Sequence, residues 1–152
     1  MNPETKGSRE NPFRAACVVI HRDGKYSAIR HAKRHQVEFA GGKSELGESI
    51  QACAVREARE ELGVEVFNLR PLFTIPLIHN DGRHYVCTVF QADIWPDADI
   101  VSSTEGQAFW ATREELIEYP YNRMPDPHNR CRMHLVAITM IENNMVGGVV
   151  EP

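Results

Sequence analysis

Three glutamates, Glu57, Glu60 and Glu61, follow one another at a spacing that places them on one face of a helix. Carboxylates at this spacing repel one another by roughly 0.2–0.5 kcal/mol per pair, and the end of a helix disfavours anions further. A hard divalent cation such as Mg²⁺ binds carboxylate oxygens together with phosphates and water. The cluster therefore predicts a metal site. The alternative is a solvated acidic face with arginine partners.

The helix that carries these glutamates has clear end signals. Ser49 is a suitable N-cap, and Gly63 is placed to end the helix in the left-handed conformation. At 3.6 residues per turn, Val55, Ala58 and Leu62 share one side, which we expect to face the core. The three glutamates are expected on the opposite side.

The surrounding spacing is specific. Residues 42–64 read GKSELGESIQACAVREAREELGV. This stretch resembles the Nudix box, GX5EX7REUXEEXGU, in which U is a bulky aliphatic residue, and every fixed position matches. Ala58, at one aliphatic position, departs from the pattern. Residues 37–43, VEFAGGK, look like the WEFPGGK lead-in of MutT-type members, with Val in place of Trp and Ala in place of Pro.

The resemblance implies a metal-dependent hydrolase. Its cofactor would be Mg²⁺, with Mn²⁺ as a substitute, and its catalytic metal ligands would be the carboxylates of Glu57, Glu60 and Glu61 and the carbonyl of Gly41. Glu48 and Arg56 would pair with each other and hold the loop against the helix.

Three residues outside this set are further candidates. Glu105, in an EGQ segment typical of MutT-type members, would be a metal ligand or the general base, and the alternative is an ordinary loop residue. Lys43 and Arg30 would bind phosphate, although Arg30 could equally be an exposed residue at a strand end. Which glutamate deprotonates water stays open.

The implied reaction is hydrolysis of a nucleoside triphosphate to a nucleoside monophosphate and pyrophosphate, with an oxidised purine such as 8-oxo-dGTP as one candidate substrate. The alternatives are an ADP-ribose or nucleotide-sugar pyrophosphatase and a catalytically idle nucleotide sensor. Several residues could contact a base, although core packing and capping explain them as well: Phe39, Tyr119, Tyr121, Asn122 and Asn129.

The composition narrows the classes of protein to which the chain can belong. The 152 residues carry a net charge of −4, which gives no support for binding long nucleic acid. No apolar run is long enough for a membrane span, and no signal peptide is evident. The four scattered cysteines indicate buried free thiols in a reducing compartment, so we expect a cytoplasmic protein. The seven histidines are interpreted as surface or loop residues. A homodimer is left open by analogy with the family.

The order of elements predicts a mixed α/β fold. A hairpin turns at Asp23-Gly24, and strands follow the helix with a break at Pro71. Two helices end the chain, and Thr112 and Glu115 are predicted to form a capping box at the start of the first. The Gly41-Gly42 pair is either a tight turn or a close approach to metal or phosphate. The resemblance adds an α/β/α sandwich with a curled sheet and a loop–helix–loop motif. We expect a flexible or partly tethered arm (1–12), one domain (13–146) and a frayed tail (147–152).

Overall fold

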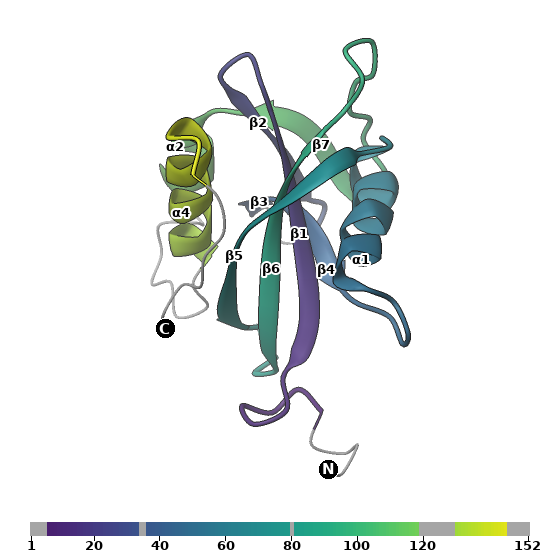
Figure 1. The fold of residues 1–152 in the computed structure, drawn as a ribbon, viewed down its shortest axis with the longest axis vertical. Coiled ribbons are helices and arrows are strands. Elements are labelled where there is room, and N and C mark those ends of the chain that lie inside the picture. The colour runs from purple at the N-terminus through teal and green to yellow at the C-terminus, as the bar shows by residue number, and fades with distance from the viewer. Residues whose placement is uncertain (1–5, 34–35, 80, 119–129, 146–152) are drawn as a thin grey trace.

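The computed structural model describes residues 6–33, 36–79, 81–118 and 130–145. A curled mixed sheet lies between helices (Figure 1), with α1 (Ile50–Glu57) on one face and α2 (Arg113–Glu118) and α4 (Arg130–Glu142) on the other. This arrangement confirms the expected α/β/α sandwich. Within the described residues, no helix is long and apolar enough to cross a membrane.

The sheet is organised around β1 (Phe13–Arg22). This strand pairs in parallel with β6 (His84–Asp93), which forms an antiparallel hairpin with β5 (Phe67–Ile78). At its far end β1 turns back into β2 (Lys25–His31), and β2 pairs with β3 (Val37–Glu38) and β7 (Gly106–Ala111). The first half of β1 instead pairs with β4 (Ala40–Lys43).

The side chains of β1 alternate between two separate hydrophobic cores. Ala16, Val18 and Ile20 are buried beneath α1, whereas Ala15 and Val19 belong to the cluster that packs against α4. Successive side chains of a strand point to opposite faces, so one strand contributes to both layers. The functional helix and the C-terminal helices are thus fixed to opposite faces of the same strand.

Helix α1 begins as predicted and ends differently from a regular helix. The Ser49 side chain accepts a hydrogen bond from the backbone N–H of Ala52 at 3.1 Å. After Glu57 the helix widens into a π-helical turn, η2 (Ala58–Leu62), and Gly63 ends it with a φ of 66°. A π turn has more residues per turn than an α-helix, which rotates the side chains that follow it.

One prediction about this helix is wrong. The three glutamates do not share a solvent-facing side: Glu57 and Glu61 are buried, and Glu60 is exposed. The expected core contacts of Ala58 and Leu62 are confirmed, because both are fully buried.

Two further local predictions are corrected by pairing. The chain runs through Pro71 as one strand, β5, whose register shifts on both sides of the proline because Pro cannot donate to a ladder. The glycine pair Gly41-Gly42 lies inside β4, paired with Cys17 and Ala16, and is not a turn.

Helix α2 and the histidines give one confirmation and one correction. The capping box forms as predicted, since the Thr112 hydroxyl accepts from the Glu115 N–H and the Glu115 carboxylate accepts from the Thr112 N–H. His134 is fully buried in α4, against the expectation of a surface position, and its Nδ1 lies 2.8 Å from the carbonyl oxygen of Leu116.

Candidate functional site

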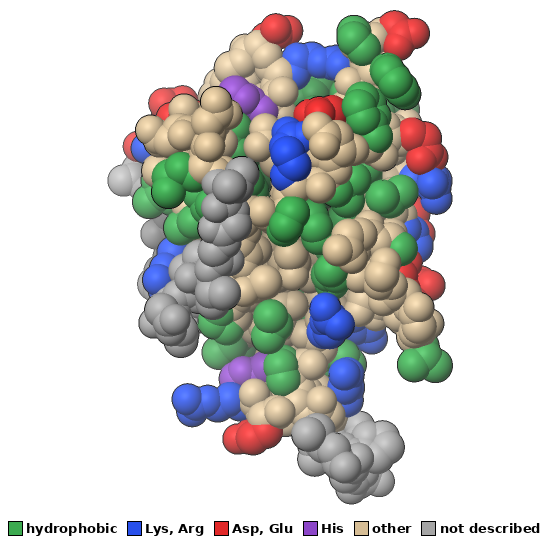
Figure 2. Space-filling model, in the orientation of Figure 1, with side chains coloured by type: hydrophobic (Ala, Val, Ile, Leu, Met, Phe, Trp, Pro, Cys, Tyr) green, Lys and Arg blue, Asp and Glu red, His purple; other side chains and the backbone are tan. Residues whose placement is uncertain are grey.

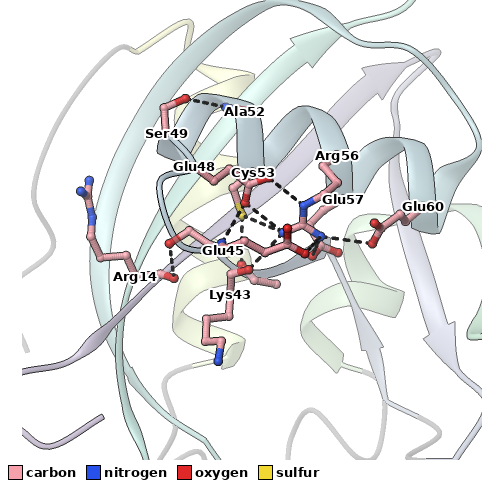
Figure 3. Close-up of polar contacts among 12 residues, drawn as sticks. Arg14, Lys43, Glu45, Glu48, Ser49, Ala52, Cys53, Arg56, Glu57 and Glu60 are labelled. Carbon is pink, nitrogen blue, oxygen red and sulfur yellow. Dashed lines mark hydrogen bonds and ion pairs between the residues drawn. The ribbon is translucent and has the colours of Figure 1, made fainter. Parts of the chain in front are cut away.

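Arg56 is the centre of the polar network on α1 (Figure 3). Its Nε and Nη2 donate to the two carboxylate oxygens of Glu48 at 2.8 and 3.0 Å. Its Nη1 donates to Glu57 at 3.0 Å and to Glu60 at 3.2 Å, and Nη2 also reaches the carbonyl of Lys43 at 3.1 Å. The predicted Glu48–Arg56 contact therefore exists, and it ties the loop before the helix to the helix itself.

This network stabilises opposite charges. The hydrogen bonds from Arg56 lower the pKa of Glu48 to about 2, and the Glu48 carboxylate raises the pKa of Arg56 above its ordinary value. Bidentate arginine–carboxylate pairs are strong and fix geometry as well as charge. Arg56 is thereby held where it also faces two of the three glutamates.

Glu57 and Glu61 form a buried acidic pair. Their side chains are hydrogen bonded to each other, and Glu61 Oε1 also accepts the backbone N–H of Gly41 at 2.7 Å. Burial raises the pKa of both carboxyl groups. Burial and the neighbouring Glu57 charge together raise the pKa of Glu61 to about 8. The pair therefore holds a proton between its carboxylates near neutral pH.

Strand β4 lies directly against this pair. A Cβ on Gly42 would stand 2.4 Å from Glu57 Oε1, and one on Gly41 would stand 2.8 Å from Cys17 Sγ. The missing side chain of Gly42 lets the strand approach Glu57, and that of Gly41 lets it approach β1. The predicted approach of the glycine pair to metal or phosphate stays a prediction.

The donor chemistry suits a hard divalent cation. Two adjacent buried carboxyl groups supply oxygen ligands of the type that Mg²⁺ prefers. The third acid, Glu60, is turned toward Arg56 on the exposed side. Accordingly, no group of three acidic, histidine or cysteine side chains in the described part of the chain is already arranged around one point.

A cavity of about 230 Å³ opens beside the acidic pair. Glu61, Gly41 and Lys43 line one part of it, and the remainder lies over the sheet toward Tyr85 and Met133. Free thiols of Cys17 and Cys87 form part of its floor, with their sulfurs 3.3 Å apart. A volume of this size, with acids at one end and apolar walls at the other, suits a small ligand with a polar and an apolar part.

Glu38 is a site residue that the sequence reasoning missed. It lines the same cavity, and its charge helps to raise the pKa of Glu61. Its position in the sequence could have indicated this role. Glu38 follows the fully buried Val37 in a two-residue strand, so alternation directs the Glu38 side chain away from the core, and the glycine pair comes shortly after it.

Two candidates lie apart from the acidic pair. Arg30 stacks on Phe109, with 5.3 Å from its guanidinium carbon to the ring centroid, and lines a second, more open hollow together with Ser103. Glu105 is exposed in the loop before β7, where its backbone bonds to Ala32 and to the side chain of Ser103. The roles of Arg30 and Glu105 at the site stay predictions. Four candidate base contacts lie outside the described residues: Tyr119, Tyr121, Asn122 and Asn129.

Comparison with known proteins identifies the class. The family description "NUDIX domain" matches residues 11–133, so the chain belongs to the Nudix family. It is a MutT-type Nudix hydrolase, an enzyme of a family that generally uses a divalent metal such as Mg²⁺.

Two relatives and one solved structure are similar to this chain. The chain is 31% identical over 113 residues to "Uncharacterized Nudix hydrolase YvcI" of Bacillus subtilis, which covers 70% of each protein. It is 35% identical over 112 residues to "CTP pyrophosphohydrolase" of Escherichia coli, covering 68% of this chain and 78% of that protein. A solved NUDIX hydrolase from Nitrosomonas europaea superposes with a TM-score of 0.67 at 21% identity, covering 84% of this chain and 90% of the other.

The raised pKa of Glu61 makes metal-free stability depend on pH. Between about 4.5, the ordinary value, and about 8, the folded protein keeps a proton that the unfolded chain has lost. This contribution to the free energy of unfolding is complete below the ordinary pKa and is lost as pH rises through 8. We expect the melting temperature in chelator to fall from pH 6 to pH 9, and Glu61→Gln to flatten that slope.

Glu65→Gln is the matched control, since it removes an exposed glutamate whose pKa is lowered by Arg59. It should leave the slope between pH 6 and pH 9 unchanged. A Glu61→Gln variant with the full wild-type slope would contradict the buried, protonated state of Glu61.

Gly42→Ala should separate function from folding. The new methyl group would displace the flexible Glu57 carboxylate, so we expect hydrolysis to fall about tenfold or more, as at disturbed metal sites, with little loss in urea stability. Gly47→Ala is the control: it has a φ of 77° with open space around it. It should cost stability and spare activity, and equal activity losses in the two variants would argue against a role for the Glu57 position.

Proposed function

We propose that this enzyme hydrolyses a nucleoside triphosphate to a nucleoside monophosphate and pyrophosphate in a Mg²⁺-dependent reaction. The observation that carries the proposal is the buried Glu57–Glu61 pair, of which Glu61 lines a cavity together with Lys43. Acidic metal ligands beside a lysine are the combination that a polyphosphate substrate requires.

Each part of the site has an assigned task in this proposal. Glu57, Glu60, Glu61 and the Gly41 carbonyl hold the metal, which when bound neutralises phosphoryl oxygens and lowers the pKa of water. Arg56 and Glu48 hold the loop and the glutamates in position. Lys43 contacts phosphate. Glu105 and Arg30 are proposed as an additional acid and an additional phosphate contact, which requires the loop before β7 to approach the bound substrate. The general base is one of the box glutamates or Glu105.

The relatives and the cavity support the proposed substrate class. A relative at 35% identity carries the name CTP pyrophosphohydrolase, which makes CTP the first candidate, with an oxidised purine triphosphate such as 8-oxo-dGTP as the second. We keep the cytoplasmic location and the homodimer as proposals. An ADP-ribose or nucleotide-sugar substrate and an idle sensor are the competing outcomes of the first experiment below.

A hydrolysis screen with Mg²⁺ tests the proposal directly. It compares CTP, the other canonical and oxidised nucleoside triphosphates, ADP-ribose and nucleotide sugars, with products separated by chromatography. We expect a nucleoside monophosphate and pyrophosphate from one or a few triphosphates. Glu60→Gln and Glu61→Gln should each reduce turnover by about 100-fold or more, because even residues behind metal ligands cost roughly 10–100-fold.

Glu114→Gln serves as the charge-matched control, since it changes an exposed glutamate of α2. Turnover confined to ADP-ribose or to a sugar nucleotide would overturn the substrate class. Wild-type turnover in Glu61→Gln would overturn the site.

Metal binding is tested separately by thermal unfolding. A cation that binds only the folded state raises its stability by mass action, so we expect Mg²⁺ at millimolar concentration to raise the melting temperature of the wild type. The effect should disappear in Glu57→Gln/Glu61→Gln, and that double variant should melt higher than the wild type in chelator at pH 9. An unchanged melting temperature of the wild type across the titration would count against the site.

A further inference from the structure

Three cationic side chains gather on one aromatic ring near the cavity. Relative to the ring centroid of Phe13, Lys43 Nζ lies at 4.6 Å, Arg83 Cζ at 5.9 Å and Lys6 Nζ at 6.0 Å. Blue Lys and Arg side chains are visible at this end of the molecule in Figure 2, where β1 and β6 begin. We call Lys6, Lys43 and Arg83 the Phe13 cation cluster.

The sheet brings two of these cations together. Phe13 begins β1 and pairs with Tyr85 of β6, and the centroids of the two rings lie 5.4 Å apart. Arg83 lies just before β6, in the hairpin. Lys43 ends β4, opposite Ala15 and thus two residues from Phe13 along β1. Sheet register alone therefore places Lys43 and Arg83 beside one ring.

The third cation is brought by a tethered turn in the segment before β1. The carbonyl of Gly7 accepts the backbone N–H of His84 at 2.7 Å, and the N–H of Gly7 donates to the carbonyl of Asn11 at 2.7 Å. Gly7 has a φ of 90°, and a Cβ there would lie 2.5 Å from Phe13 Cε2. A glycine is required for the turn to lie this close to the ring, and the turn fixes Lys6 over it.

The positive charge of the cluster is largely uncompensated. Arg83 has one carboxylate partner, Asp81, at 3.3 Å. Within the described residues, Lys6 and Lys43 have no ion pair. Cation–π contacts at exposed sites contribute only about 0.5–1 kcal/mol each, and like charges repel. In a chain with a net charge of −4, this gathering suits an anionic ligand with more than one negative charge.

The position of the cluster identifies that ligand. Lys43 spans the two regions: its carbonyl accepts from Arg56, and its side chain points away from the glutamate network (Figure 3) toward Phe13. Tyr85, which touches Phe13, lines the same cavity as Glu61. A phosphate chain with one phosphorus beside the acidic pair can therefore continue along β4 toward the cluster.

We propose that the Phe13 cation cluster is the subsite for the distal phosphates of the substrate, those that leave as pyrophosphate. This inference rests on the proposed function. It makes Lys6 and Arg83 specificity-determining residues, because they favour a triphosphate, which carries negative charge beyond the cleaved bond, over a diphosphate joined to a neutral sugar.

Binding of inorganic tripolyphosphate tests the subsite without catalysis. Calorimetry in chelator would compare the wild type with Lys6→Gln, Arg83→Gln and the double variant. We expect the dissociation constant to rise about tenfold or more in the double variant, as expected for the loss of hydrogen bonds to a charged group. Lys25→Gln, which removes an exposed lysine at the opposite end of the β1–β2 hairpin, should leave the dissociation constant unchanged.

Thermal melts followed by circular dichroism establish whether each variant folds. If the double variant does not fold, the two single variants still test the subsite. Equal tripolyphosphate affinity in all variants, or an equal loss in Lys25→Gln, overturns the subsite and leaves only solvated surface cations. A selective loss in the cluster variants supports it.

Kinetics separate the subsite from the proposed function. The subsite predicts that Lys6→Gln and Arg83→Gln raise the KM for the triphosphate with little change in kcat and leave ADP-ribose hydrolysis, where present, unaffected. An enzyme that hydrolyses no triphosphate but binds tripolyphosphate through Lys6 and Arg83 overturns the proposed function and supports the subsite. Triphosphate hydrolysis that is insensitive to both substitutions supports the function and overturns the subsite.

Discussion

The Arg56 guanidinium is the interaction on which the rest of the site depends. Its bidentate pair with Glu48 fixes the loop after β4 against α1, and the same group donates to Glu57 and Glu60. Without this cation, the helix would present repelling carboxylates with only backbone donors nearby. Arginine suits the position because its planar fork serves several acceptors at once, which a lysine ammonium on a flexible chain does not.

The π-helical turn after Glu57 gives the three glutamates different environments. Glu61 is rotated toward β4, where it bonds to Gly41 and to Glu57, while Glu60 stays on the exposed side beside Arg56. Glu57 and Glu61 share a proton in a buried place, whereas the exposed Glu60 is paired with Arg56, so the set combines a region that suits a cation with one that already has a cationic partner.

The features that the sequence predicted correctly are governed by near neighbours. Ser49 caps the helix, Thr112 and Glu115 form their box, and Asp23 and Gly24 both adopt positive φ in the hairpin, because each depends on residues within a turn. The errors arise from pairing between distant segments. The register with β6 carries β5 through Pro71, and β1 draws the glycine pair into a strand. The box motif identified the acids, yet Glu38 became visible only when β3 reached the cavity.

Strand β4 orders charge along the site. Its middle, Gly41-Gly42, abuts the acidic pair, and its end, Lys43, reaches the Phe13 cation cluster. An anionic chain laid along this strand meets a metal-binding region first and a cationic region next, and the protein's own acids would repel it in the first region unless a cation intervened. The proposed requirement for metal and the proposed preference for a substrate with distal phosphates would thus both depend on one strand, which Gly41 and Gly42 allow to lie close to β1 and the helix.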